Sequence, residues 1–132
     1  MPEKVIQACA NASIAEWRVW CTCENSLWLV NYKIVEACKI TMADDSLNAK
    51  FNPSRAAAQE HERCHCRDYA DAVDAIAKQL DTMGPFATAE ACNKAINPLS
   101  VPAMFKANTA SFNDHNNLKY KPGGACYSTG DF

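Results

Sequence analysis

One long helix dominates the elements that this sequence predicts. Asn52 is a good N-cap residue and Pro53 suits the first helical position, so a helix is expected to begin there. It continues through SRAAAQEHERCHCRDYADAVDAIAKQLDTM until Gly84 ends it. This is the longest element in the chain, and the residues with the most distinctive chemistry lie on it.

Strand chemistry precedes this helix over residues 16–42. In EWRVWCTC the apolar residues and cysteines at 17, 19, 21 and 23 alternate with the residues at 18, 20 and 22, as in a strand. Glu24-Asn25-Ser26 then supplies turn residues before LWLVNYKIV. We therefore expect an antiparallel hairpin. A third short strand is predicted in ACKITM, and the sheet is expected to end near Met42.

Two shorter helices are expected after the long one, over 87–96 and roughly 102–115, and the tail KYKPGGACYSTGDF is expected to be a loop. With 132 residues the chain has the size of one ordinary domain, so a single domain over 1–132 is predicted. The order of elements predicts an α+β fold, in which a small antiparallel sheet is followed by the long helix and further helices.

The charge balance disfavours a nucleic-acid or anionic-membrane partner. The chain has 13 basic and 15 acidic side chains and no run of Lys or Arg. The longest strongly apolar stretch, around 27–30, is far too short to cross a bilayer, so no membrane span is predicted.

Eight cysteines suggest disulfides formed in an oxidising place, which favours a secreted or periplasmic protein. The start, MPEKVIQACANAS, lacks a basic segment followed by a long apolar run, so export would follow removal of a signal or use another route. Eight cysteines allow 105 complete pairings, and the sequence selects none. A rival interpretation, in which CTC and CHC hold a structural zinc or an iron–sulfur cluster, is disfavoured because Cys-x-x-Cys spacing suits such sites better.

The stretch EHERCHC places two of the three histidines four residues apart, with a glutamate between them. With 100° per residue and His61 at 0°, His65 falls at about 40° and Glu62 at about 100°. The same side of the helix contains the apolar residues Ala58, Tyr69, Ala72, Val73, Ile76 and Leu80, which form one apolar stripe. The ionisable trio is therefore expected on the face of the helix that packs inward.

A buried glutamate beside two imidazoles costs several kcal/mol unless a cation compensates it. Histidines one helical turn apart project side by side and can both bind one Zn²⁺, while Glu62 reaches a water bound to the metal. His61 and His65 are thus the expected zinc ligands and Glu62 the expected catalytic base. The alternative is that three polar residues fell together by chance.

This pattern is the His-Glu-x-x-His motif of zincin metallopeptidases. HERCHCRDYADAVDAIAKQL, ACNKAINP and KANTASFNDHNN together resemble a family of small secreted bacterial proteins predicted to be zinc proteases. The resemblance covers roughly residues 52–117 and is specific only at the motif; Cys64 and Cys66, around His65, depart from the pattern, as does the lack of a clear Asp-x-x-Thr-x-His-Gly ending. It implies a minimal zincin-like domain in which the edge strand of the sheet receives an extended substrate.

A catalytic zinc needs a third protein ligand and leaves one position for water. His115 is the first candidate, because it is the only other histidine and imidazole is a common zinc ligand. Asp114 is the next candidate. Glu90, on the following helix, is the third, since a Glu downstream of the motif is the ligand in gluzincin-like sites.

Other polar residues have weaker expected roles. Asp71 is discounted, because without a glycine the helix continues and turns it away from the histidines. Asp68 is expected either to accept a hydrogen bond beside His65 or to be a surface partner on the helix. Tyr120 and Tyr127 are candidates for a donor to the oxyanion of the reaction.

The predicted function is zinc-dependent hydrolysis of a peptide or amide bond, with a protein, a peptide or a cell-wall peptide as substrate. Small size, many cysteines and the absence of an ordinary signal would suit a bacterial effector, which would imply a secretion machine and an immunity protein as partners. The alternative is a disulfide-stabilised binding or immunity module in which the motif holds a structural metal or none.

Overall fold

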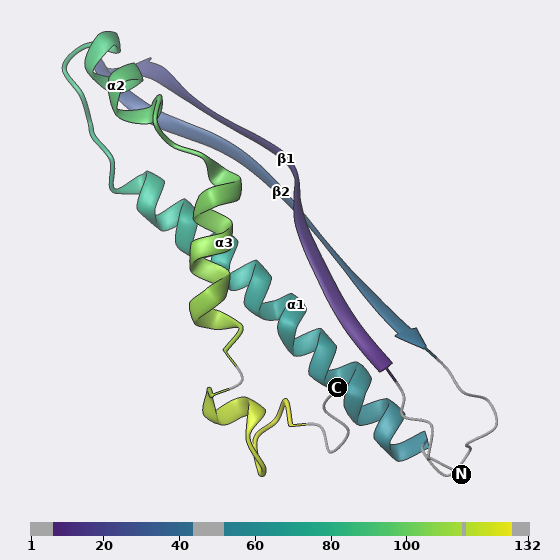
Figure 1. Cartoon of the computed structure of the whole chain (residues 1–132). Helices are drawn as coiled ribbons and strands as arrows, with labels where there is room; N and C mark the ends of the chain where they lie inside the picture. Colours follow the sequence, from purple (N-terminus) through teal and green to yellow (C-terminus); the bar gives the residue numbers. More distant parts are fainter. Residues whose placement is uncertain (1–6, 44–51, 115, 128–132) are drawn as a thin grey trace.

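The computed structural model describes residues 7–43, 52–114 and 116–127 (Figure 1). The elements follow the chain in this order: β1 (Gln7–Glu24), β2 (Leu27–Ala43), α1 (Asn52–Asp81), α2 (Ala89–Ile96), α3 (Val101–Phe112) and the short 3₁₀ helix η2 (Leu118–Tyr120). A two-stranded antiparallel sheet followed by helices confirms the predicted α+β class.

The sheet is one long hairpin. β1 and β2 pair antiparallel along almost their whole length, and Asn25 and Ser26 connect them. Both residues have positive φ, 52° and 66°, as the two-residue turns that match the twist of a hairpin require. The predicted hairpin and its turn are confirmed.

The predicted third strand is wrong. Residues 37–42 continue β2 without a turn, and they pair with residues 8–13, which precede the predicted start of the sheet. The early part of β1, ACANAS, has small side chains and little strand propensity of its own, so pairing with β2 determines its structure.

A bulge in β1 changes which positions face the helices. The register shifts between Ile14 and Glu16, so inward side chains are even-numbered before the bulge and odd-numbered after it. Ala12 and Ile14 on one side of the bulge, and Val19 on the other, all pack against the core.

The helices pack on one side of this hairpin. α1 runs along it, α3 lies against α1, and α2 lies at the turn end of the hairpin (Figure 1). The buried core comprises Ala72, Ile76 and Leu80 from α1 with Val101 and Phe105 from α3. The predicted inward stripe of the long helix is therefore confirmed.

The ends of the helices are close to the expected ones. α1 begins at Asn52 and ends shortly before Gly84, whose φ of 83° turns the chain. The hydroxyl of Thr88 caps α2, where it accepts a hydrogen bond from the N–H of Ala91 at 3.1 Å. α3 ends at Phe112 rather than at residue 115.

Three disulfides join the elements: Cys21–Cys92 links β1 to α2, Cys38–Cys66 links β2 to α1, and Cys64–Cys126 links α1 to the end of the described chain. Both sulfurs of CHC and one sulfur of CTC are therefore in disulfide bonds and cannot act as thiolate ligands. The thiolate-cluster interpretation is wrong. Cys9 and Cys23 are exposed and unpaired in the described part of the chain. None of the helices described combines the length and apolar character needed to cross a bilayer.

Candidate metal centre

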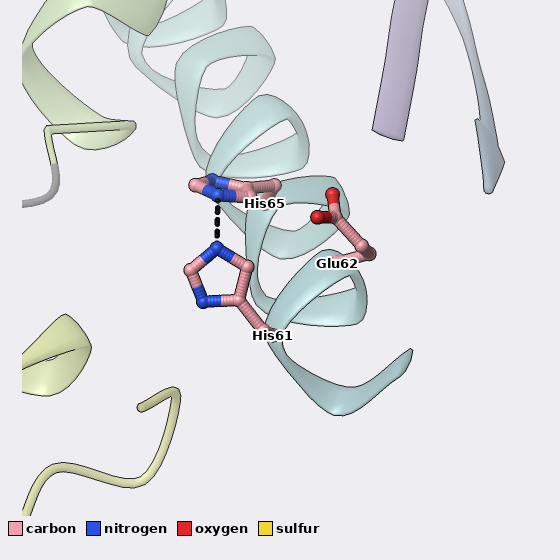
Figure 2. Close-up of side chains that lie close together, drawn as sticks. All are labelled: His61, Glu62 and His65. Atoms are coloured by element: carbon pink, nitrogen blue, oxygen red, sulfur yellow. Dashed lines mark hydrogen bonds between the residues drawn. The ribbon is translucent and has the colours of Figure 1, made fainter. Parts of the chain in front are cut away.

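The three motif residues lie in the N-terminal half of α1, and all three are buried. His61 is 3% exposed, Glu62 8% and His65 6%, although a glutamate is rarely buried and a histidine is usually buried only in part. Figure 2 shows both imidazole rings projecting from one side of α1, with Glu62 on the neighbouring part of the helix surface. One ligand atom from each residue can be chosen so that all three lie within 4.8 Å of one another.

The two histidines approach each other through the same ring atom. Nε2 of His61 lies 3.0 Å from Nε2 of His65, and the rings are nearly perpendicular, with centroids 4.5 Å apart (Figure 2). Two nitrogens that bind one tetrahedral Zn²⁺ at about 2.0–2.1 Å lie about 3.3 Å apart. The observed separation therefore fits two ligands of a single ion.

The other ring nitrogen of His61 is held by the backbone. Nδ1 lies 2.8 Å from the carbonyl oxygen of Cys126, and a carbonyl oxygen only accepts hydrogen bonds. Nδ1 of His61 therefore carries the hydrogen and donates it. In the neutral ring, Nε2 then carries the lone pair that a metal requires.

The other ring nitrogen of His65 is held by a side chain. Nδ1 lies 3.1 Å from the hydroxyl of Tyr120, and this hydroxyl donates to a carboxylate oxygen of Asp68. Because the single hydroxyl hydrogen is used in this way, the Tyr120 oxygen accepts the hydrogen of Nδ1. Burial first, and then the hydrogen bond to Asp68, raises the pKa of Tyr120, so its hydroxyl remains a donor.

These contacts determine what the site can hold. Both Nδ1 atoms donate, so in the neutral form of the two rings the Nε2 lone pairs face each other at 3.0 Å. Two facing lone pairs repel unless a positive charge lies near both, and either a proton shared by the two nitrogens or a divalent cation supplies that charge. Nitrogen donors beside a carboxylate suit zinc.

The C-terminal segment, residues 116–127, supplies these supports. It lies beside the N-terminal half of α1 (yellow in Figure 1), and the Cys64–Cys126 disulfide joins it to the helix. Within the expected loop, residues 119 and 120 belong to η2, and residues 121–126 form turns and bends. Sequence reasoning missed the roles of Lys119 and of the Cys126 carbonyl, since no pairing of Cys126 could be selected.

Two of the three candidates for a third ligand, Asp114 and Glu90, lie in the described part of the chain, and neither belongs to the group at the motif. His115 lies outside the described residues. Asp114 is exposed, and its carboxylate accepts the N–H of Asn116 at 2.9 Å. Glu90 is exposed on α2 at the far end of α1 (Figure 1), whereas Glu62 lies about 28 Å along the helix from Asp81.

The remaining predicted residues are placed clearly. Asp68 is fully buried, so its expected role as an acceptor near His65 stands and the surface alternative is wrong. The hydroxyl of Tyr120 faces Nδ1 of His65 and not Nε2, so this tyrosine supports the imidazole instead of facing a substrate. Tyr127 and Asp71 are exposed.

Comparisons with protein-family models, with curated proteins and with solved structures found no match to this chain. The function is therefore inferred from the geometry of the motif and of the groups that support it.

Proposed function

We propose that the chain is a zinc-dependent hydrolase of peptide or other amide bonds. The observation that carries this proposal is the convergence of two buried Nε2 atoms whose rings both donate through Nδ1. A pair of histidines packed only for structure would need no such common polarity. A zinc site with histidine ligands does need it, since each neutral imidazole must offer its lone pair.

The chemistry follows from the neighbours of this pair. A bound Zn²⁺ would supply a Lewis acid that acidifies a water molecule and polarises an amide carbonyl. Glu62, in the same buried group, would act as the general base for that water and as the general acid for the leaving nitrogen. His61 and His65 hold their orientation through Cys126 and Tyr120.

Three disulfides are typical of proteins that fold in an oxidising compartment, and they support a secreted or periplasmic location. The substrates would then be proteins, peptides or the peptide amides of a cell wall. A bacterial effector that acts outside the producing cell, with an immunity protein as partner, fits the same properties.

A structural metal site is the second candidate, and the deep burial of the motif favours it. At 3–8% exposure, the three residues resemble an interior site more than an open cleft. Removal of the metal distinguishes the two functions. A hydrolase broadly keeps its fold and loses turnover with a chelator, whereas a structural site loses stability with its metal.

The test is zinc content and peptidase activity of the oxidised wild-type protein, of His61→Ala and of Glu62→Gln. We expect stoichiometric zinc in the wild type, loss of zinc in His61→Ala, and retained zinc without turnover in Glu62→Gln. A wild-type protein that binds no zinc would exclude both functions that use the metal. Full activity in Glu62→Gln would exclude the proposed base.

A further inference from the structure

We propose that Tyr120 is the positioning residue for His65: its hydroxyl fixes the imidazole as the Nδ1–H tautomer, and Asp68 and Lys119 hold that hydroxyl in place. This inference deepens the proposed function, on which its metal-binding consequence rests. The tautomer itself can be measured without any metal.

Tyr120 contacts both imidazoles with its ring. It stacks on His65 with centroids 4.7 Å apart and an interplanar angle of 20°, and it meets His61 edge-on at 5.2 Å. Tyr120 itself is only 4% exposed. The ring thus limits the rotation of His65, while the hydroxyl determines which nitrogen carries the hydrogen.

Asp68 acts on His65 through this hydroxyl. Its Oδ2 lies 4.0 Å from Nδ1 of His65, too far for a direct hydrogen bond, whereas the Tyr120 oxygen lies 3.1 Å from the same nitrogen. Asp68 accepts the hydroxyl hydrogen and leaves the tyrosine oxygen able to accept from the imidazole. His65 therefore meets a neutral acceptor, as His61 does at the Cys126 carbonyl.

Lys119 compensates the negative charge of the buried Asp68 carboxylate. Asp68 is fully buried, and an isolated carboxylate there would be strongly unfavourable. The ammonium group of Lys119 pairs with Oδ1, opposite the oxygen that receives Tyr120. Because η2 carries Lys119 and Tyr120 in succession, one short turn delivers both groups to Asp68.

These contacts predict a specific effect on metal binding. They run from Lys119 to Asp68, from Asp68 to Tyr120 and from Tyr120 to His65. Partners that orient a metal-binding histidine typically contribute 10–100-fold in affinity. Removal of the hydroxyl leaves the His65 Nδ1–H without this acceptor, so the hydrogen redistributes between the two nitrogens. Molecules with hydrogen on Nε2 cannot bind the ion through that atom.

The test compares the wild type with Tyr120→Phe, and uses Tyr69→Phe as the matched control. Tyr69 is a half-buried tyrosine of α1 whose hydroxyl accepts from Asn113. Long-range ¹H–¹⁵N spectra of metal-free protein report the tautomer of His65, and competition with a chelator reports Zn²⁺ affinity. Both readouts are taken on folded protein, as judged by circular dichroism.

We expect the Nδ1–H tautomer at His65 in the wild type and a mixture in Tyr120→Phe, with Zn²⁺ affinity about 10–100-fold lower. Tyr69→Phe should match the wild type in both readouts. An Nε2–H tautomer in the wild type overturns the proposal, and this measurement needs no variant to fold. Unchanged tautomer and affinity in Tyr120→Phe also overturn it. If the wild type binds no Zn²⁺ but its tautomer depends on Tyr120, the proposed function fails and the positioning role stands.

Discussion

Nδ1 of His61 lies 2.8 Å from the carbonyl oxygen of Cys126, a residue 65 positions further along the chain. The sulfur of the same Cys126 is bonded to Cys64, which lies between the two histidines of the motif. A single residue thus supports the candidate metal centre through its backbone and fastens its own segment to α1 through its side chain.

Loss of the Cys64–Cys126 disulfide should weaken metal binding. In the double variant Cys64→Ala/Cys126→Ala, the C-terminal segment is no longer fastened, so the supports of both histidines loosen. We expect Zn²⁺ affinity to fall at least about tenfold, as measured by chelator competition.

The matched control is Cys21→Ala/Cys92→Ala, which removes the disulfide between β1 and α2. Each double variant should lose roughly 2–4 kcal/mol of stability, so affinity is measured where both are folded. Equal affinities in the two variants would contradict a role for the C-terminal segment at the metal.

Gly124 should tolerate no side chain. A Cβ atom at this position would lie 2.4 Å from the carbonyl oxygens of Leu118 and Lys119, inside the turn that presents Tyr120. Gly124→Ala should therefore displace η2 and lower both thermal stability and Zn²⁺ affinity. Gly123→Ala is the control, because its Cβ meets nothing within 4 Å and only its φ of 88° is strained. Equal losses in the two variants would count against the close approach.

Truncation in the core should affect stability without affecting the metal centre. Ile76 of α1 is fully buried in the core that α1 forms with α3 and the sheet. Ile76→Ala should therefore lower the free energy of unfolding, measured in urea, by about 2–5 kcal/mol. It lies about 16 Å along α1 from His65, so Zn²⁺ affinity of the folded protein should not change. Lys78→Ala, at an exposed position of the same helix, should change stability by less than about 0.5 kcal/mol.

Glu36 gives the protein a predictable pH dependence. Burial first, and then the charge of Asp74, raises the pKa of Glu36 above its usual 4.5. Between that value and the raised one, the folded state binds more protons than the unfolded state, so stability falls as pH rises. Glu36→Gln should therefore be more stable than the wild type at pH 7, by about 0.5 kcal/mol or less because the group is partly solvated.

Urea unfolding at two pH values measures this effect. The advantage of Glu36→Gln should disappear well below pH 4.5, where Glu36 is protonated in both states. An advantage of equal size at both pH values would indicate a packing effect instead of a charge effect.

The elements that follow local rules could be predicted from the sequence. Asn52 and Gly84 gave the limits of α1, and the period of its apolar residues gave the inward face on which His61, Glu62 and His65 are buried. The turn at Asn25 and Ser26 was equally predictable, because Asn and Ser are common turn residues and here they separate two runs with strand chemistry.

Features that depend on contacts between distant residues could not be predicted. The early part of β1 becomes a strand only because β2 extends far enough to pair with it. Tyr120 was identified as a polar candidate, but its contact with Nδ1 of His65 depends on a fold in the C-terminal segment that Cys126 completes. The sequence alone did not indicate which of 105 pairings would form.

The link between Cys64 and Cys126 also has a consequence for the maturation of the protein. In a reducing cytoplasm this bond does not persist, so a newly made chain would carry its two histidines without the fastened support. The centre would become complete only after transfer to an oxidising space. If the chain is the hydrolase proposed above, the cell that makes it would thus be spared its activity until this bond has formed.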